Sequence, residues 1–261
     1  MPPDKAPIRG YSCTYWCKLW ETGVPYVDKI CTCKYSLYPM KPSRDCMASR
    51  IVVNERRGAN KTRSQTPIIF FIDIDGTLTD GSVREHIMEQ EGFVIGEYGS
   101  PDRIYPHGKQ TFLEAFCNPE LFETDITMPN AVEIIEAIKS ALKSMEIYVF
   151  FVTARDSQHH QETEEDLRHR GLWINGARLV CKPHRKAPKT VEYKTSVFAG
   201  VVNALNPSNI VIIDNSKHIL DGAIKCFSAS TYRTAVNTFE CCTDALNWWK
   251  SYVEHQMRSA Y

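Results

Sequence analysis

The sequence lacks any long apolar run. None of its stretches approaches the roughly 18 consecutive apolar residues that a membrane-spanning helix needs, so we expect no membrane partner. The first ten residues, MPPDKAPIRG, contain no apolar segment of the kind found in secretory signals. From these two absences we expect an intracellular, cytoplasmic protein.

The sequence also lacks a G-x-x-x-x-G-K-[ST] loop, which excludes a kinase of the P-loop type. It has no net charge, with 31 Lys and Arg against 31 Asp and Glu. This balance hides an asymmetry, because residues 1–66 carry a net +7 and residues 67–261 a net −7. A basic arm on an acidic body indicates an anionic partner such as nucleic acid, although a solvated basic tail explains the charge equally well.

Residues 1–46 look like a module of their own, joined by a basic linker at 47–66. Five of the ten cysteines lie here, and four of them form a C-x3-C pair and a C-x-C pair, Cys13, Cys17, Cys31 and Cys33. Four thiolates could hold a structural Zn²⁺, which would supply the folding energy that so short a segment lacks. Tyrosines and tryptophans among lysines in the same segment could stack on bases, or could form a small aromatic core.

The most informative stretch is PIIFFIDIDGTLTD at 67–80. Its apolar run has no helical period and predicts a buried strand that ends at Asp73. Asp75 and Thr77 follow, with Gly76 to permit a turn. Two carboxylates at the end of a buried strand are costly unless they bind a metal or take part in chemistry.

From residue 67 onward, strand and helix patterns alternate, which predicts an α/β domain over 67–261 with a mainly parallel sheet covered on both faces. The irregular stretch 80–125 predicts a small cap or flap. The later elements that we expect are helices at 129–145, 162–170, 194–205 and 243–257, strands at 147–152, 177–181 and 209–213, and a weaker strand near 226–230. The helix at 129–145 should begin with Pro129 in its first turn and bury Val132, Ile135, Ile138 and Leu142.

Polar residues follow three of the predicted strands: Asp73, Thr153 and Asp214. In parallel sheets the carboxyl ends of the strands meet at one edge, so these residues should lie together with Asp75. Carboxylate oxygens suit Mg²⁺, which keeps several waters and bridges to phosphate. Asp73 could then attack phosphorus, and Asp75 could act as general acid and base. Thr77 has no evident direct role and could shape the turn.

These motifs, Asp73-Ile-Asp75-Gly-Thr77, Thr153-Ala-Arg155, a helical Lys194 and Ile213-Asp214, resemble in their order the haloacid dehalogenase (HAD) superfamily. The resemblance implies a Rossmannoid three-layer sandwich and an aspartyl-phosphate mechanism. It implies Asp73 as nucleophile and Asp75 as general acid and base. The phosphate contacts would be Thr153, Arg155 and Lys194. The Mg²⁺ ligands would be Asp73, Asp214 and the backbone carbonyl of Asp75.

Two positions depart from the family pattern or leave a choice. The family often has a second acidic residue after the fourth-motif aspartate, but here the residue is Asn215, and Asp221 could compensate only if the chain turned back. Lys189 competes with Lys194 for the third motif. We favour Lys194 because the apolar spacing that starts at Val191 places it within a helix.

A finer resemblance, over 112–171, is to the phosphatase half of phage-type polynucleotide kinases and related RNA-repair phosphatases. It implies a Mg²⁺-dependent phosphomonoesterase that acts on a nucleotide or a nucleic-acid end as a 3′-phosphatase. The basic cluster between Arg178 and Lys194 could receive such a polyanion. Two alternatives remain open: a small-metabolite phosphatase of the same superfamily, and an inactive protein of this fold that binds nucleic acid or serves as a scaffold. The sequence does not predict an oligomeric state.

Overall fold

The computed structural model describes residues 67–90, 118–182, 189–228 and 234–258. The predicted cysteine-rich module at 1–46 and the linker at 47–66 lie outside these residues, as does the middle of the predicted flap. The described residues form an α/β fold, so the predicted fold class is confirmed. In the part of the chain that is described, no helix combines the length and the apolar character needed to cross a membrane.

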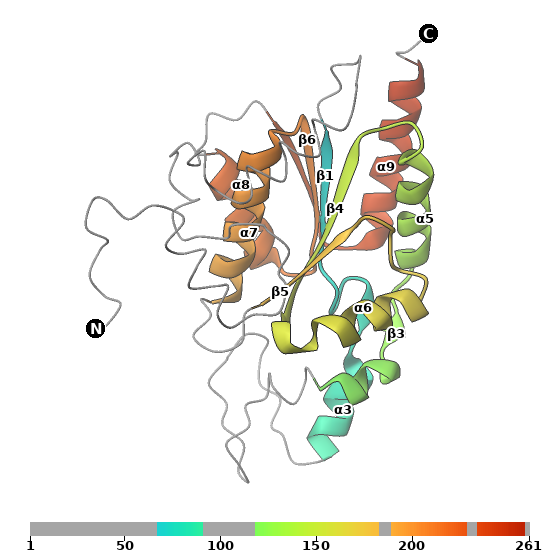
Figure 1. The fold of residues 1–261 in the computed structure, drawn as a ribbon, viewed down its shortest axis with the longest axis vertical. Helices are drawn as coiled ribbons and strands as arrows, with labels where there is room; N and C mark the ends of the chain where they lie inside the picture. Colours follow the sequence, from blue (N-terminus) through green and yellow to red (C-terminus); the bar gives the residue numbers. More distant parts are fainter. Residues whose placement is uncertain (1–66, 91–117, 183–188, 229–233, 259–261) are drawn as a thin grey trace, which may run out of the picture.

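Five strands form a single parallel sheet in the order β5-β4-β1-β6-β7, seen edge-on in Figure 1. The strands are β1 (Ile68–Ile72), β4 (Ile147–Asp156), β5 (Arg178–Lys182), β6 (Asn209–Ile213) and β7 (Ala235–Phe239). β1 is apolar throughout and lies in the middle, as expected for a strand that is buried on both faces. The run of apolar residues that suggested a buried strand therefore forms the centre of the molecule.

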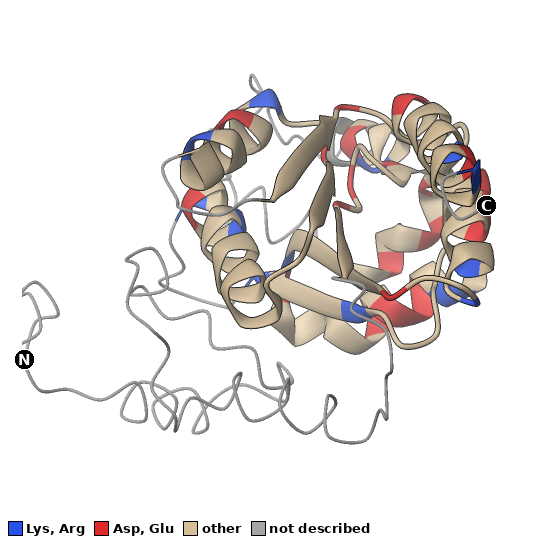
Figure 2. Cartoon of the chain, turned by 90° about the horizontal axis from the view of Figure 1, so that it is seen from above, with Lys and Arg blue, Asp and Glu red and all other residues tan. Residues whose placement is uncertain are grey.

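Helices cover both faces of this sheet and complete three layers (Figures 1 and 2). The helices are α3 (Ser82–Gln90), α5 (Ala131–Ala141), α6 (His160–His169), α7 (Thr190–Leu205), α8 (Lys217–Ser228) and α9 (Cys242–Arg258). α7 and α8 pack on one face, where Phe198 and Leu220 contact the core around Phe71. α5 and α9 pack on the other, where Ile135 and Trp249 join Phe70. The alternation of β1 side chains between the two cores follows from the two-residue period of a strand.

The strand order places a switch point at the middle of the sheet. From β1 the chain builds outward through β4 to β5, and it then crosses back to add β6 and β7 on the other side of β1. Ile72 of β1 pairs in register with Ile213 of β6, so the next residues, Asp73 and Asp214, leave the sheet side by side. Ligands in open α/β sheets bind at such a point, outside the carboxyl ends of the strands.

Short elements lie beyond this edge of the sheet. β2 (Thr79–Asp80) and β3 (Ile126–Thr127) pair antiparallel, and the 3₁₀ helix η1 (Pro119–Thr124) precedes β3. Asp80 caps α3 because its Oδ1 accepts a hydrogen bond from the Ser82 N–H at 2.9 Å. The described parts of the predicted flap thus place α3 and η1 next to the site.

Three local predictions were wrong. Residues 226–228, which we expected in a weak strand, belong to α8, and the strand comes later as β7, a partly exposed edge strand. α5 begins after Asn130, which has φ 59°, so Pro129 precedes the helix. The buried face of α5 includes Ile134, whereas Val132 is exposed at 39%.

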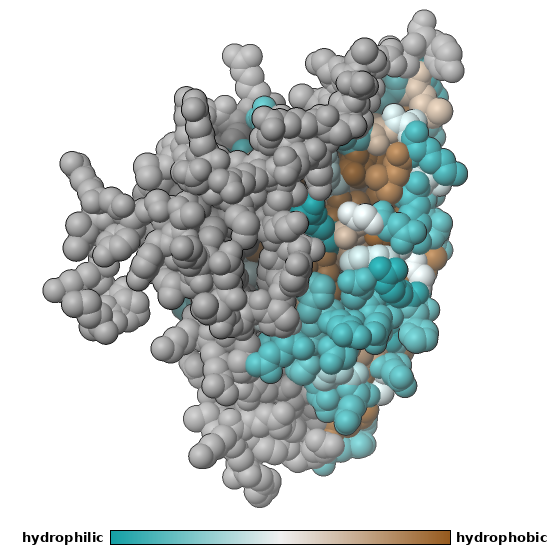
Figure 3. All heavy atoms as spheres, in the orientation of Figure 1, coloured by the Kyte–Doolittle hydropathy of each residue, from teal (hydrophilic) through white to brown (hydrophobic). Residues whose placement is uncertain are grey.

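α6 begins close to its predicted position. It follows a one-turn 3₁₀ helix, η2 (Ser157–His159), which Asp156 caps by accepting a hydrogen bond from the Gln158 N–H. Gly171, with φ +72°, follows the end of α6. On the face shown in Figure 3, the described residues are mainly hydrophilic in the lower half and more hydrophobic near the top.

Candidate active site

Asp73, Lys194 and Asp214 meet at the switch point. The Lys194 ammonium lies 2.7 Å from Asp73 Oδ1 and 2.7 Å from Asp214 Oδ2. All three side chains are buried, with at most 9% of any of them exposed. Two carboxylates and one ammonium leave this triad with one excess negative charge.

The backbone fixes this triad from three elements. The Asp73 N–H donates to the Ile213 carbonyl at 2.9 Å, which extends the β1–β6 ladder by one residue. Lys194 lies in the second turn of α7, whose apolar residues pack on the sheet. Lys189, the other candidate for the third motif, is exposed at the N-cap of α7. The geometry therefore places Lys194, and not Lys189, between the two carboxylates.

Burial decides the protonation behaviour of this triad. Burial raises the pKa of Asp73 to about 7; Lys194 opposes the shift and Asp214 adds to it. For Lys194, burial disfavours the charged form, but Asp73 and Asp214 outweigh it and raise the pKa of the ammonium. Lys194 therefore stays protonated, and its single positive charge does not compensate the negative charges of both Asp73 and Asp214.

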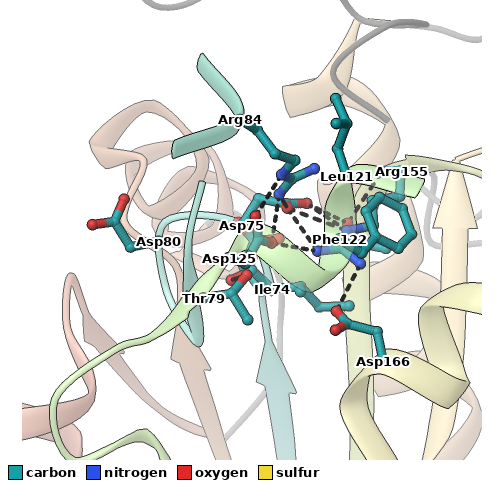
Figure 4. Close-up of polar contacts among 12 residues, drawn as sticks. Ile74, Asp75, Thr79, Asp80, Arg84, Leu121, Phe122, Asp125, Arg155 and Asp166 are labelled. Atoms are coloured by element: carbon teal, nitrogen blue, oxygen red, sulfur yellow. Dashed lines mark hydrogen bonds and ion pairs between the residues drawn. The ribbon is translucent and has the colours of Figure 1, made fainter. Parts of the chain in front are cut away.

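Asp75 pairs with two arginines (Figure 4). Arg155 Nη2 lies 2.9 Å from Asp75 Oδ1, and Arg155 Nε donates to Oδ2 at 3.1 Å. Arg84 Nη2 donates to the same Oδ1 at 2.5 Å. Burial alone would raise the pKa of Asp75, but Arg155 and Arg84 lower it well below the usual range of a carboxyl group. Asp75 is therefore held as a carboxylate.

A second carboxylate, Asp125, completes this cluster. Arg84 donates to both of its oxygens, at 2.6 and 2.8 Å, and Arg155 Nη2 lies 3.3 Å away. Two arginines and two carboxylates balance, and both arginine side chains are fully buried. Sequence reasoning missed Arg84 and did not assign Asp125 a role, because a charged residue on a short helix or loop is most often a solvated one.

Thr153 links the second motif to Asp75. Its hydroxyl accepts a hydrogen bond from the Arg155 N–H at 3.1 Å and lies 3.4 Å from Asp75 Oδ2, to which it can donate. The pairing of β4 with β5 shifts register between Thr153 and Asp156, so the strand is irregular where it carries these two motif residues. Thr153 is fully buried and lies beside Asp75, as predicted from the strand ends.

Thr77 turns out to join two of the motif loops. Its hydroxyl accepts a hydrogen bond from the Asn215 N–H at 3.0 Å, and its carbonyl accepts one from Cys242 Sγ at 3.2 Å. Gly76 has φ +78°, and a Cβ atom there would lie 2.2 Å from the Asn215 amide nitrogen. Only glycine fits this turn, for both backbone and steric reasons. Asn215 thus packs on the first-motif loop, while Asp221 is exposed on α8.

Comparison with known proteins adds a fold likeness only. No protein-family model matches the chain, and no curated protein matches it. Among solved structures, the HAD domain of effector protein Lem4 from Legionella pneumophila is similar, with 12% identity, a TM-score of 0.44 and coverage of 74% of this chain and 95% of that one. At this identity and TM-score the likeness carries no information about activity, and the fold class rests on the sheet order itself.

Mg²⁺ fits the chemistry of the Asp73–Lys194–Asp214 triad in part. The donors are all oxygens and the triad has an excess negative charge, both of which suit a hard cation. Against this, Lys194 lies between the two carboxylates. Within the described ranges there is no group of three His, Cys, Asp or Glu side chains arranged to hold a metal. The predicted zinc ligands Cys13, Cys17, Cys31 and Cys33 lie outside those ranges.

Proposed function

We propose that the chain is a Mg²⁺-dependent phosphomonoesterase, a hydrolase of HAD type that forms an aspartyl-phosphate on Asp73. The observation that carries the proposal is the Asp73–Lys194–Asp214 triad at the sheet's switch point. A buried site with unbalanced negative charge is costly for a protein that makes no use of it. The same arrangement is suited to a metal ion that carries a phosphate with it.

The first step follows from the position of Asp73. One of its carboxylate oxygens attacks phosphorus, the P–O bond to the leaving group breaks, and the leaving oxygen takes a proton. In this proposal Lys194 and the Thr153 hydroxyl donate to the phosphoryl oxygens, and Arg155 lies next to Thr153. When bound, Mg²⁺ would be held by Asp73, Asp214 and the Asp75 carbonyl, and it would neutralise charge on the phosphoryl group.

The second step uses Asp75. Water attacks the phosphorus of the aspartyl-phosphate, Asp75 accepts a proton from it, and inorganic phosphate leaves with Asp73 regenerated. The two arginines hold Asp75 as a carboxylate, the form that a base requires, and their pairing at the same time weakens it as a base. The acid role in the first step requires Asp75 to take up a proton after the substrate phosphate has drawn the arginines toward itself.

For the substrate we propose a nucleotide or a nucleic-acid end. The support is the charge pattern of the sequence: a basic segment between Arg178 and Lys194 and the net +7 of residues 1–66. A small phosphorylated metabolite would not need either basic segment, which is why we rank it second.

The test is phosphate release from a 3′-phosphorylated oligonucleotide, a mononucleotide and an aryl phosphate, each with Mg²⁺ and with a chelator. We expect Mg²⁺-dependent release that is fastest on the oligonucleotide. Asp73→Asn should abolish release, while Asp221→Asn, which changes an exposed carboxylate, should leave it unchanged. No Mg²⁺-dependent release from any of the three would refute the phosphatase and favour the inactive binding or scaffold protein.

A further inference from the structure

The side chain of Arg155 contacts Asp75 along one edge and is held on its other sides by groups beyond the proposed catalytic residues. Its Nε and Nη2 edge faces Asp75, whereas Nη1 lies 3.2 Å from Asp166 Oδ2 on α6. Its guanidinium carbon lies 3.8 Å above the centre of the Phe122 ring, which comes from η1 (Figure 4). Asp125 contacts Nη2 from the end of the same segment. The orientation of Arg155, and with it that of Asp75, therefore depends on where α6 and η1 lie.

One residue, Arg170, ties these supports together. Its Nε donates to Asp166 Oδ1 at 2.7 Å, its Nη1 to the Asp125 carbonyl at 2.8 Å and its Nη2 to the Phe122 carbonyl at 2.7 Å. All three nitrogens of the guanidinium are engaged, and 14% of the side chain is exposed. None of these hydrogen bonds of Arg170 involves Asp75, Asp73 or Lys194.

The sequence fixes Arg170 in this position. It caps the C-terminus of α6, one turn after Asp166, so the two side chains lie on one face of the helix. Leu167 anchors that helix in the core, and Gly171, with φ +72°, ends it directly after Arg170. A guanidinium offers donors in a fixed planar fork, which suits three acceptors in different directions; a lysine ammonium cannot reach all three with the same geometry.

We propose that Arg170 is a positioning residue for proton transfer by Asp75. This rests on the proposed phosphatase function. Arg170 fixes Asp166 and the backbone of η1, these fix Arg155, and Arg155 sets the direction in which the Asp75 carboxyl group meets the leaving oxygen. Removing Arg170 should leave Asp73, Lys194 and Asp214 untouched, so that attack on phosphorus is kept while protonation of the leaving group is impaired.

The dependence on leaving group separates this role from a general structural one. Nitrophenolate leaves phosphorus with little help from an acid, whereas an alkoxide needs a proton. For Arg170→Met we expect kcat/KM on an alkyl phosphate to fall by about 10- to 100-fold, as for other residues that support a catalytic group from behind. On nitrophenyl phosphate we expect a loss of no more than about 3-fold.

Arg168→Met is the matched control. Arg168 lies on the same helix and is half-exposed; its side chain pairs with Glu164 and lies over the Trp173 ring, and neither of these contacts belongs to the Arg155 cluster. Its replacement should change neither substrate's kcat/KM. Circular dichroism and thermal melting show whether Arg170→Met folds. If it does not, Arg170→Lys is compared on the same two substrates, because it keeps the positive charge and lacks the planar guanidinium.

The outcomes are distinct. An equal loss on both substrates overturns the positioning role and makes Arg170 a structural residue only. Failure of the unsubstituted protein to hydrolyse either substrate, together with no Mg²⁺-dependent release from the 3′-phosphorylated oligonucleotide and the mononucleotide, refutes the proposed function instead. A selective loss on the alkyl phosphate in Arg170→Met, partly restored in Arg170→Lys, supports the inference.

Discussion

Replacing Asp73 with asparagine should make the metal-free protein more stable at neutral and alkaline pH. Asp73, Lys194 and Asp214 together carry one excess negative charge in a buried site. Asparagine has the same shape as aspartate and leaves Lys194 paired with Asp214, so the triad becomes neutral. The Asp73 carboxylate, which we propose as the nucleophile, is thus expected to destabilise the folded state when no metal is bound.

The size of the effect follows from the pKa of Asp73. Burial raises it from 3.8 to about 7, so the folded state binds a proton more tightly than the unfolded state does. Stability from this group is therefore highest at low pH and is lost as pH rises from about 4 to about 7. At pH 8 the full difference corresponds to about 4 kcal/mol, and at pH 5 to about 2 kcal/mol. These are upper limits, because relaxation and entry of water reduce the cost of a buried charge.

The assay is urea-induced unfolding of the wild type and Asp73→Asn in chelator, at pH 8 and at pH 5. We expect the variant to have the higher free energy of unfolding, by a margin that narrows at the lower pH. Asp221→Asn, which removes an exposed carboxylate, is the control and should differ little from the wild type at either pH. Millimolar Mg²⁺ should stabilise the wild type more than Asp73→Asn.

Two results would refute this reasoning. Asp73→Asn could be no more stable than the wild type at pH 8, which would mean that Lys194 already compensates both carboxylates. Alternatively, the margin could stay constant between the two pH values, which would mean that it does not come from ionisation of Asp73.

Three further substitutions test other contacts. Thr77→Val removes the hydroxyl that accepts from the partly buried Asn215 N–H and should cost about 1–2 kcal/mol in urea unfolding, whereas Thr77→Ser should stay near the wild type. Lys194→Met leaves two buried carboxylates without their cation and should lower phosphate release by at least about 100-fold; Lys189→Met, at an exposed position, should not. Arg84→Met removes the two short contacts of the buried Asp125 and leaves it only the 3.3 Å contact with Arg155, so it should lower the free energy of unfolding by about 3–5 kcal/mol. Adding Asp125→Asn should recover part of that loss; additive losses in the double variant would contradict the pairing.

The sheet and the place of the site were predictable because both depend on burial. β1 and β6 are buried on both faces, so their sequences are apolar apart from Asn209 at the start of β6, and the polar residues that follow mark where each strand leaves the core. The order of these strand ends along the chain was enough to bring Asp73, Thr153 and Asp214 to one edge. β7 was missed because it is an edge strand with partly exposed side chains and has no such apolar run.

The cluster around Asp75 could not be predicted in the same way. Arg84, Asp125 and Arg155 are buried and pair with one another. The sequence alone does not distinguish a charged residue that is buried with a partner from one that lies on the surface. Thr77 is a similar case: its partner is the backbone of Asn215, far along the chain, and a hydrogen bond to a backbone N–H leaves no pattern in the sequence. Contacts that depend on the tertiary arrangement became visible only in the structure.

The central place of β1 also bears on how the chain is made. β1 is synthesised before both of its partners: Ile68 pairs with Ile147 of β4 and with Asn209 of β6, and among the described strands the next along the chain, β2, pairs with β3 instead. Until its partner strands have been synthesised, an apolar strand can pair with strands of other molecules. Pairing between strands that are far apart in the sequence also slows folding. On a ribosome, both edges of IIFFI would stay open until most of the protein had emerged. The strand that centres the finished site is therefore the segment for which assistance by a chaperone during synthesis would matter most.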